Sequence, residues 1–231
     1  MALLDKFVVT ATAKSIRRKH VLLKTSSVIL MISVLLLLMF YGFASFANTI
    51  GTFTIKINNT DGERAISLSN TSTFEQPTTY IEADALDGMD NITESWLPTD
   101  IDEIDGAHNG ENYIAHTFYL KNVGTLDINY QADIKIVDVQ KEADEAIRVK
   151  VYKNGESTLF AKQQKELNIP EPDTTPFYSI DKVMSQEYLD FKVGEVDKYT
   201  IVVWLEGNDP ECVDEIIGGR VKLEMNFKII E

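Results

Sequence analysis

Residues 221–229 read Val-Lys-Leu-Glu-Met-Asn-Phe-Lys-Ile, and this stretch decides the fold class. Five apolar side chains alternate with four polar ones, as in an extended backbone whose successive residues face opposite sides. An α-helix would spread these apolar residues around its circumference, because its period is 3.6 residues. The pattern therefore predicts an antiparallel β-strand with one face in a hydrophobic core and the other in water.

Strands of the same kind recur between residue 53 and the end of the chain. Three further stretches alternate in this way, namely residues 53–57, 128–136 and 147–151. Residues 114–120 and 199–206 are apolar on both faces, which is typical of central strands. The domain is therefore expected to consist mainly of β-strands.

Turn-forming residues separate these stretches. Asn122-Val123-Gly124, Asn154-Gly155 and Val193-Gly194-Glu195 are typical of hairpins and corners. Eight to ten strands at this spacing predict an all-β fold, a two-sheet antiparallel sandwich of the Ig-like or jelly-roll type. Two short helices are expected between strands. One covers residues 140–146, and the other begins at Asp209-Pro210-Glu211 and ends at Gly218-Gly219.

Two stretches lack a regular pattern. Residues 168–190 contain Pro170, Pro172 and Pro176, and this predicts a long loop over one end of the sandwich. Residues 83–111 hold most of the clustered acidic side chains. The acidic stretch is where metal-binding residues are expected.

A basic start and an apolar run precede the strands. Residues 1–25 contain six basic side chains, and residues 26–47 contain no charged one. The apolar run is long enough to span a bilayer, and the basic flank places the N-terminus in the cytoplasm. A cleaved signal peptide is the alternative, because small residues precede Asn48. Both interpretations put residues 48–231 outside the cytoplasm, on the cell membrane or secreted to the cell surface.

Charge is divided unevenly along the chain. Of the 22 basic and 36 acidic residues, six and one lie in residues 1–47, which leaves 16 and 35 in the rest, a formal charge of −19. A surface of that sign repels phosphate, so nucleic acid is excluded as a partner. The single cysteine, Cys212, cannot form a disulfide within the chain, which for a secreted domain is commoner in Gram-positive bacteria.

The acidic loop is the candidate metal site. Its oxygen-bearing side chains lie close together around Gly106, as calcium ligands do: Asp100, Asp102, Asp105, Asn109 and Glu111. The spacing is not that of an EF-hand, and a solvated acidic loop is the alternative. Asp87-Gly88-Met89-Asp90 and residues 206–212 are weaker candidates, and a structural turn is the preferred explanation of the second.

Catalytic motifs are not found in the sequence. It contains no G-x-S-x-G, no H-E-x-x-H and no phosphate-binding glycine loop. His116 falls within an expected strand and is interpreted as structural, as is Cys212 in the second expected helix. Carboxylates are so numerous that no pair of them points to glycoside hydrolysis. We therefore expect a protein that is not an enzyme.

Three short motifs carry a family resemblance. Residues 117–124 (TFYLKNVG), 191–195 (FKVGE) and 204–219 (WLEGNDPECVDEIIGG) resemble segments of secreted Firmicutes β-sandwich proteins. In the second motif, Val193 stands where those proteins usually have proline. The overall layout is similar to that of the TasA/camelysin group of biofilm-matrix proteins. The resemblance implies an extracellular matrix or envelope role and transfers no catalytic residue.

These observations lead to one expected function and one alternative. We expect an envelope or matrix component that associates with itself or with other envelope proteins and polymers, with residues 48–57 as a strand that can be donated to a neighbouring copy. The alternative is a membrane-anchored module that binds carbohydrate or another ligand. In that case Trp96 is the candidate contact residue, because Trp204 is expected to be buried.

Overall fold

The structure is a computed structural model that describes residues 25–41, 53–58, 62–84, 86 and 88–230. It divides into two units, residues 1–49 and 50–231, which are described separately. Three predicted features lie outside the described residues: the N-terminal segment 1–24 with its six basic side chains, the cleavage position before Asn48, and Asp87 of the second metal candidate. In the first unit, residues 25–41 are helical, and Ser33 Oγ donates a hydrogen bond to the Leu30 carbonyl at 2.8 Å. Among the described residues, no helix has both the length and the apolar character needed to cross a bilayer.

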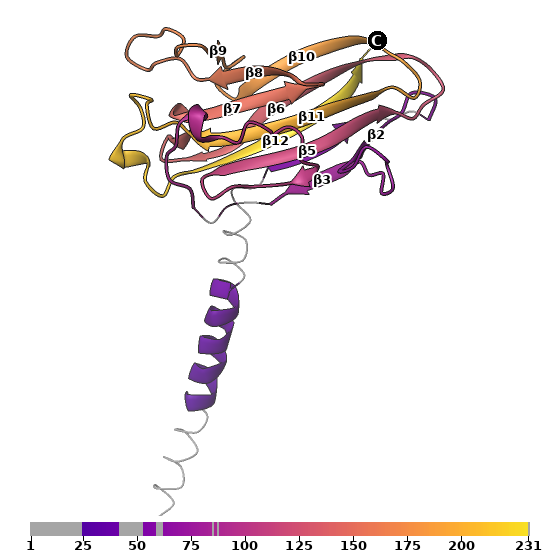
Figure 1. The fold of residues 1–231 in the computed structure, drawn as a ribbon. Helices are drawn as coiled ribbons and strands as arrows, with labels where there is room; N and C mark the ends of the chain where they lie inside the picture. The colour runs from indigo at the N-terminus through magenta and orange to yellow at the C-terminus, as the bar shows by residue number, and fades with distance from the viewer. Residues whose placement is uncertain (1–24, 42–52, 59–61, 85, 87, 231) are drawn as a thin grey trace, which may run out of the picture. The chain divides into compact units, whose positions relative to one another are not determined.

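The second unit contains two mixed β-sheets (Figure 1). The five-stranded sheet has the order β10-β6-β12-β1-β3. Its strands are β1 (Phe53–Asn58), β3 (Tyr80–Ala83), β6 (Ile128–Gln140), β10 (Lys182–Phe191) and β12 (Arg220–Ile230). The decisive stretch 221–229 lies in β12, the central strand of this sheet, as its alternation predicts.

The second sheet has seven strands in the order β2-β5-β11-β7-β8-β9, with β4 paired to β5. Its strands are β2 (Ile66–Ser69), β4 (Gly106–Ala107), β5 (Tyr113–Asn122), β7 (Ile147–Lys153), β8 (Glu156–Ala161), β9 (Thr175–Pro176) and β11 (Val196–Leu205). The strands expected to be central, β5 and β11, are neighbours in the middle of the sheet. Their side chains are buried on both faces over most of their length.

One hydrophobic core joins the two sheets. Phe118 of β5 stacks on Tyr199 of β11 at 5.6 Å between ring centroids, and both rings meet the edge of Phe227 from β12. Burial of such rings contributes a large share of core stability. The sheets therefore pack face to face, and the predicted mainly β fold with two packed sheets is confirmed.

The prediction of purely antiparallel sheets is wrong. β1 runs parallel to β12, with Phe53 opposite Leu223, and β8 runs parallel to β9. A parallel pair requires a long connection, and β1 and β12 meet this requirement because they lie at opposite ends of the domain. The alternation in β1 was recognised, but alternation reports which face a side chain takes and not the direction of the neighbouring strand.

The two expected helices are shorter than predicted. β6 continues through Gln140, and only Ala143–Glu145 form a single 3-10 turn, η2. The second helix is reduced to another 3-10 turn, η3 (Asp214–Ile216), which is preceded by hydrogen-bonded turns from Glu206 to Cys212. A third turn, η1 (Glu94–Trp96), lies in the acidic stretch. Helix formation has a costly nucleus, so these short segments stop after one turn.

The long loop predicted at residues 168–190 is only half correct. Its second half is β10, an edge strand ten residues long in which Val183 and Met184 are buried. The register of β10 against β6 shifts twice, between Lys182 and Met184 and between Tyr188 and Phe191. These bulges interrupt the period of two, and the apolar residues therefore show no alternation in the sequence.

The glycine turns that the sequence predicted are confirmed where they close hairpins. Asn154 and Gly155 connect β7 to β8 with φ angles of 52° and 88°. Positive φ at both central residues is the geometry that matches the twist of a two-residue hairpin. Gly194 (φ 81°) connects β10 to β11 in the same region of φ.

Candidate functional site

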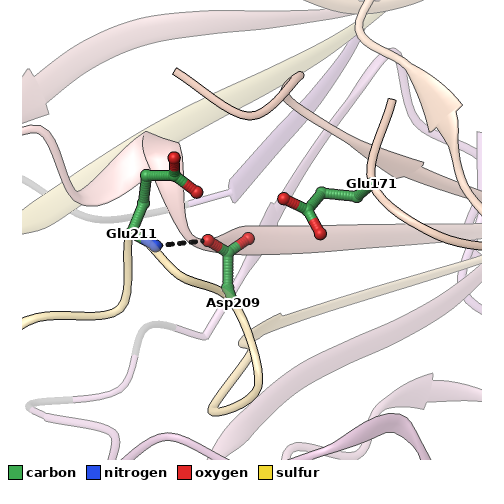
Figure 2. A group of neighbouring side chains, drawn as sticks. All are labelled: Glu171, Asp209 and Glu211. Atoms are coloured by element: carbon green, nitrogen blue, oxygen red, sulfur yellow. Dashed lines mark hydrogen bonds between the residues drawn. The ribbon is translucent and has the colours of Figure 1, made fainter. Parts of the chain in front are cut away.

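Three carboxylates converge at one end of the second sheet (Figure 2). Glu171 lies in the loop between β8 and β9, and Asp209 and Glu211 lie in the turn that follows β11. One ligand oxygen from each of the three lies within 4.8 Å of the others. Within the described part of the chain, no other three His, Cys, Asp or Glu side chains come this close together. This carboxylate cluster is the candidate functional site.

The turn geometry positions Asp209 and Glu211. The backbone N–H of Asp209 donates to the Glu206 carbonyl at 3.2 Å, and the N–H of Cys212 donates to the Asp209 carbonyl at 3.0 Å. Asp209 Oδ1 in turn accepts the backbone N–H of Glu211 at 2.8 Å. Such Asx turns hold a short carboxylate against its own backbone. Glu171 is held differently, by Thr174, whose Oγ1 and N–H both donate to the Glu171 carbonyl.

Arg148 of β7 is the buried cation beside the cluster. Its Nη1 donates to Asp209 Oδ2 at 2.6 Å, and its Nη2 lies 3.5 Å from Glu171 Oε2. Arg148, Asp209 and Glu171 are 4%, 5% and 5% exposed. One guanidinium against three ionised carboxylates leaves a formal charge of −2, and two of the three carboxylates, Glu171 and Asp209, are shielded from water.

Two observations show that this charge is not balanced. Among the described residues, Glu171 Oε1 and His116 Nδ1 are the buried side-chain polar atoms without a hydrogen-bond partner. Burial, and after it the carboxyl of Asp209, raises the pKa of Glu211 above its ordinary value. Two carboxylate charges within 4.8 Å of each other repel by on the order of 3 kcal/mol or more at an effective dielectric constant of about 20. The cluster is therefore costly to the fold in the absence of a further cation.

A solvent-accessible cleft leads to the cluster. It has a volume of about 750 Å³, and Glu211 lies in its wall. Four more glutamates line it, which are Glu142, Glu145, Glu166 and Glu215. Its two basic side chains are Lys141 and Lys165, and Lys165 already pairs with Glu142 at 2.5 Å. The cleft thus connects solvent to Glu211 along a mainly acidic surface.

The acidic loop predicted to bind calcium does not gather its side chains in the same way. Asp105 accepts a hydrogen bond from Tyr119 at 2.6 Å. Burial, followed by this hydrogen bond, raises the pKa of Tyr119 to about 12. The Asn109 side chain donates to the Asp84 carbonyl and accepts the N–H of Ala115. Asp100 and Glu111 are exposed and Asp102 is half-buried. Calcium binding at this loop stays a prediction.

The remaining predicted residues take separate places. His116 is buried in β5 with Nε2 2.9 Å from Asn70 Oδ1, and burial, followed by the charge of His108, lowers its pKa to about 4. Cys212 is a half-buried free thiol that accepts a hydrogen bond from Asn91. Trp204 is buried as expected, whereas Trp96 is 71% exposed in η1. These residues lie on different elements and do not form a second site together.

Sequence reasoning found part of the cluster. Residues 206–212 were recognised as a candidate, and they contain Asp209 and Glu211. Glu171 and Arg148 were missed, because they come from a proline-rich loop and from a neighbouring strand. The one available signal for Arg148 is its position in β7, where a charged residue sits between the apolar side chains of Ile147 and Val149.

The comparisons with known proteins offer little beyond this. No protein-family description matches the sequence, and no curated protein matches it either. Among solved structures, the chain is similar to a β-glucosidase from Kluyveromyces marxianus in complex with glucose, with 12% sequence identity and a TM-score of 0.27. The match covers 72% of this chain and 15% of that chain. A likeness at this level carries no argument about activity.

Proposed function

We propose that the protein is a non-enzymatic component of the cell envelope or extracellular matrix, held at or delivered to the cell surface by its N-terminal segment. Its β-domain is a sandwich of the Ig-like or jelly-roll type that associates with further copies through β1. The observation that carries this proposal is the place of β1, which is the first strand of the domain and lies inside the five-stranded sheet between β12 and β3.

The contacts of β1 support its role as an exchangeable strand. All six of its residues pair with β12, and four of them pair with β3 on the other side. Phe53 and Ile55 are 2% and 0% exposed and belong to the main core. A sheet that lacks β1 has two open edges and an open core groove, and an identical strand from another copy satisfies both.

The experiment distinguishes a donated strand from one that stays in its own chain. Asn58 and Lys228 are partners across the β1–β12 pair and both are exposed. Chains carrying Cys212→Ser with Asn58→Cys are mixed, before assembly, with chains carrying Cys212→Ser and Lys228→Cys. Donation predicts disulfide-linked dimers on a non-reducing gel, because only a β1 from the other chain brings the two thiols together.

The control tests whether the disulfide is specific for the β1–β12 pair. A mixture of the Asn58→Cys chain with a Glu187→Cys chain places the second thiol on the exposed edge strand β10 and is expected to give no specific linkage. Deletion of residues 48–57 is expected to abolish fibres. Absence of the Asn58–Lys228 linkage, with fibres of normal length in the deletion variant, would exclude assembly through β1.

Exposure of Trp96 favours a second candidate, a surface module that binds carbohydrate. Trp96 is 71% exposed, and its sequence neighbours Ser95 and Leu97 line a groove of about 680 Å³. Exposed aromatic rings present a flat apolar surface to a ligand. Saturable quenching of tryptophan fluorescence by a carbohydrate, lost in Trp96→Ala, would support this candidate, and no quenching across soluble glycans would exclude it.

A further inference from the structure

Glu171 gives the carboxylate cluster its significance. A carboxylate buried to this degree normally fills its acceptor positions, since an unsatisfied charged oxygen in the interior is strongly unfavourable. Glu171 Oε1 nevertheless has no hydrogen-bond partner, although the side chain is only 5% exposed. Its carboxylate points at Asp209 and Glu211 (Figure 2). An unpaired buried oxygen that faces two further carboxylates calls for a positive ion between them.

We infer that Glu171, Asp209 and Glu211 form a binding site for a hard divalent cation, and that the cation is calcium. The three residues offer oxygen ligands only, and hard cations prefer oxygen. Two ligand oxygens on opposite sides of a calcium ion lie about 4.6–5.2 Å apart, since each bond is about 2.3–2.6 Å long. One ligand oxygen from each of the three residues lies within 4.8 Å of the others, a spacing that is compatible with this span.

The surroundings leave one side of the cluster open to the ion. Arg148 contacts Asp209 Oδ2 and Glu171 Oε2, and these contacts do not use Glu171 Oε1 or Asp209 Oδ1. Glu211 Oε1 accepts the backbone N–H of Lys165 at 2.9 Å, which leaves its other lone pair and Oε2 for a metal. Asp209 Oδ1 accepts one backbone N–H, which leaves a lone pair for a metal. Three carboxylates provide fewer than the six to eight oxygens of calcium, and water from the acidic cleft beside Glu211 completes the shell.

Calcium fits this site better than magnesium for a geometric reason. The ligands come from one loop and one Asx turn, which do not impose a regular octahedron. Magnesium requires near-ideal octahedral geometry with bonds of about 2.0–2.1 Å, whereas calcium accepts irregular shells. This site is independent of the proposed assembly through β1, because none of its residues belongs to β1 or to the strands that flank β1.

The test is a calcium titration of the full-length chain in detergent after metal has been removed with EDTA. Isothermal titration calorimetry is expected to show one calcium per chain in the wild type and a magnesium affinity at least tenfold weaker. Glu171→Gln keeps the size of the side chain and removes its charge, and it is expected to weaken calcium binding at least tenfold. Glu187→Gln, the same substitution on the exposed edge strand β10, is the matched control and is expected to bind like the wild type.

A second readout separates loss of a ligand from loss of the fold. Without metal, the thermal midpoint of Glu171→Gln is expected to be no lower than that of the wild type, because one of three mutually repelling carboxylates is removed while Arg148 keeps its contact with Asp209. The rise in midpoint that calcium gives the wild type should be lost in the variant. If Glu171→Gln does not fold, Glu211→Gln at the cleft carries the same expectation of a tenfold loss. A wild type without saturable calcium binding, or a folded Glu171→Gln chain with wild-type affinity, would overturn the inference.

Discussion

Two groups of buried carboxylates in this domain differ in how their charge is balanced. Asp197 of β11 accepts hydrogen bonds from Tyr130 at 2.5 Å, from Lys153 at 2.8 Å and from Asn154 at 2.6 Å. Both of its oxygens are thus used, and one cation faces one anion. In the carboxylate cluster, three anions lie beside one buried cation, Arg148, and Glu171 Oε1 has no hydrogen-bond partner.

The difference distinguishes a structural polar network from a binding site. The Asp197 network joins the two sheets, because Tyr130 comes from β6 and bonds to Tyr199 of β11 at 2.7 Å. A satisfied network of this kind makes the packing of the sheets specific. Glu171 and Asp209 of the carboxylate cluster are as deeply buried as Asp197, but Glu171 Oε1 lacks a hydrogen-bond partner. The stability of the cluster should therefore depend on the cations dissolved in the buffer.

The largest effect is expected from Arg148→Met. The substitution removes the one buried cation beside the carboxylate cluster, and breaking a buried ion pair in this way destabilises a protein by about 3–5 kcal/mol. Urea denaturation in EDTA is expected to show that loss, and saturating calcium should recover part of it by replacing the missing positive charge. Lys228→Met, at an exposed position of β12, is the control and should change the free energy of unfolding by less than about 0.5 kcal/mol. Equal effects of the two variants would mean that Arg148 does not balance the cluster.

A smaller effect that does not depend on calcium is expected from Asp197→Asn. Hydrogen bonds to a charged group contribute about 1.5–3 kcal/mol, and the variant leaves Lys153 without its anion. The loss in free energy of unfolding should be about 2 kcal/mol, equal in EDTA and in calcium. A loss that calcium reverses would erase the distinction between the two groups of carboxylates.

The pH dependence of stability is expected to sharpen the contrast. The pKa of Glu211 is raised in the folded state, so the folded chain binds its proton more tightly than the unfolded chain does. The stability contributed by that proton is present below the ordinary pKa of 4.5 and is lost as pH rises through the raised value. Metal-free wild type should therefore lose stability relative to Glu211→Gln across this window, as measured by denaturation at a series of pH values.

Calcium should reverse that pH trend, because the metal binds the deprotonated carboxylate. In saturating calcium the wild type is expected to gain stability relative to Glu211→Gln over the same pH window. If the difference in free energy of unfolding between the wild type and Glu211→Gln stays constant with pH in both buffers, Glu211 is not a calcium ligand.

The strands were accessible to sequence reasoning because their signal is local. In the middle of β12 and the first half of β6, apolar side chains enter the core at every second position, so the sequence itself alternates between apolar and polar residues. β10 was not predicted, because two register shifts interrupt the alternation of its side chains. The parallel pairing of β1 with β12 leaves no local trace, because strand direction is a property of the neighbour.

The carboxylate cluster was less accessible because its members and Arg148 come from three separate segments. Arg148 and Asp209 are 61 residues apart in the sequence and meet only through the pairing of β7 with β11. Glu171 reaches them from a loop whose prolines predict irregularity but not its position. The acidic loop attracted attention because its ligands are close in sequence, yet Asp105 and Asn109 form hydrogen bonds within the fold instead.

The smallest effect is expected from Asp102→Asn in that acidic loop. Asp102 is half-buried and belongs to no group of three ligand atoms within 4.8 Å in the described residues. The calcium affinity of the Asp102→Asn chain, measured by isothermal titration calorimetry, should stay within about twofold of that of the wild type. A tenfold loss would move the calcium site from the carboxylate cluster to the loop predicted from the sequence.

The central claim is most directly tested by the position of a bound ion. Terbium replaces calcium at oxygen sites and scatters anomalously, so crystals of the full-length chain grown with terbium can locate it in an anomalous difference map. The account predicts one strong peak about 2.3–2.6 Å from oxygens of Glu171, Asp209 and Glu211. A peak at residues 100–111 instead, or no peak beside Glu171 Oε1 at saturating terbium, would contradict it.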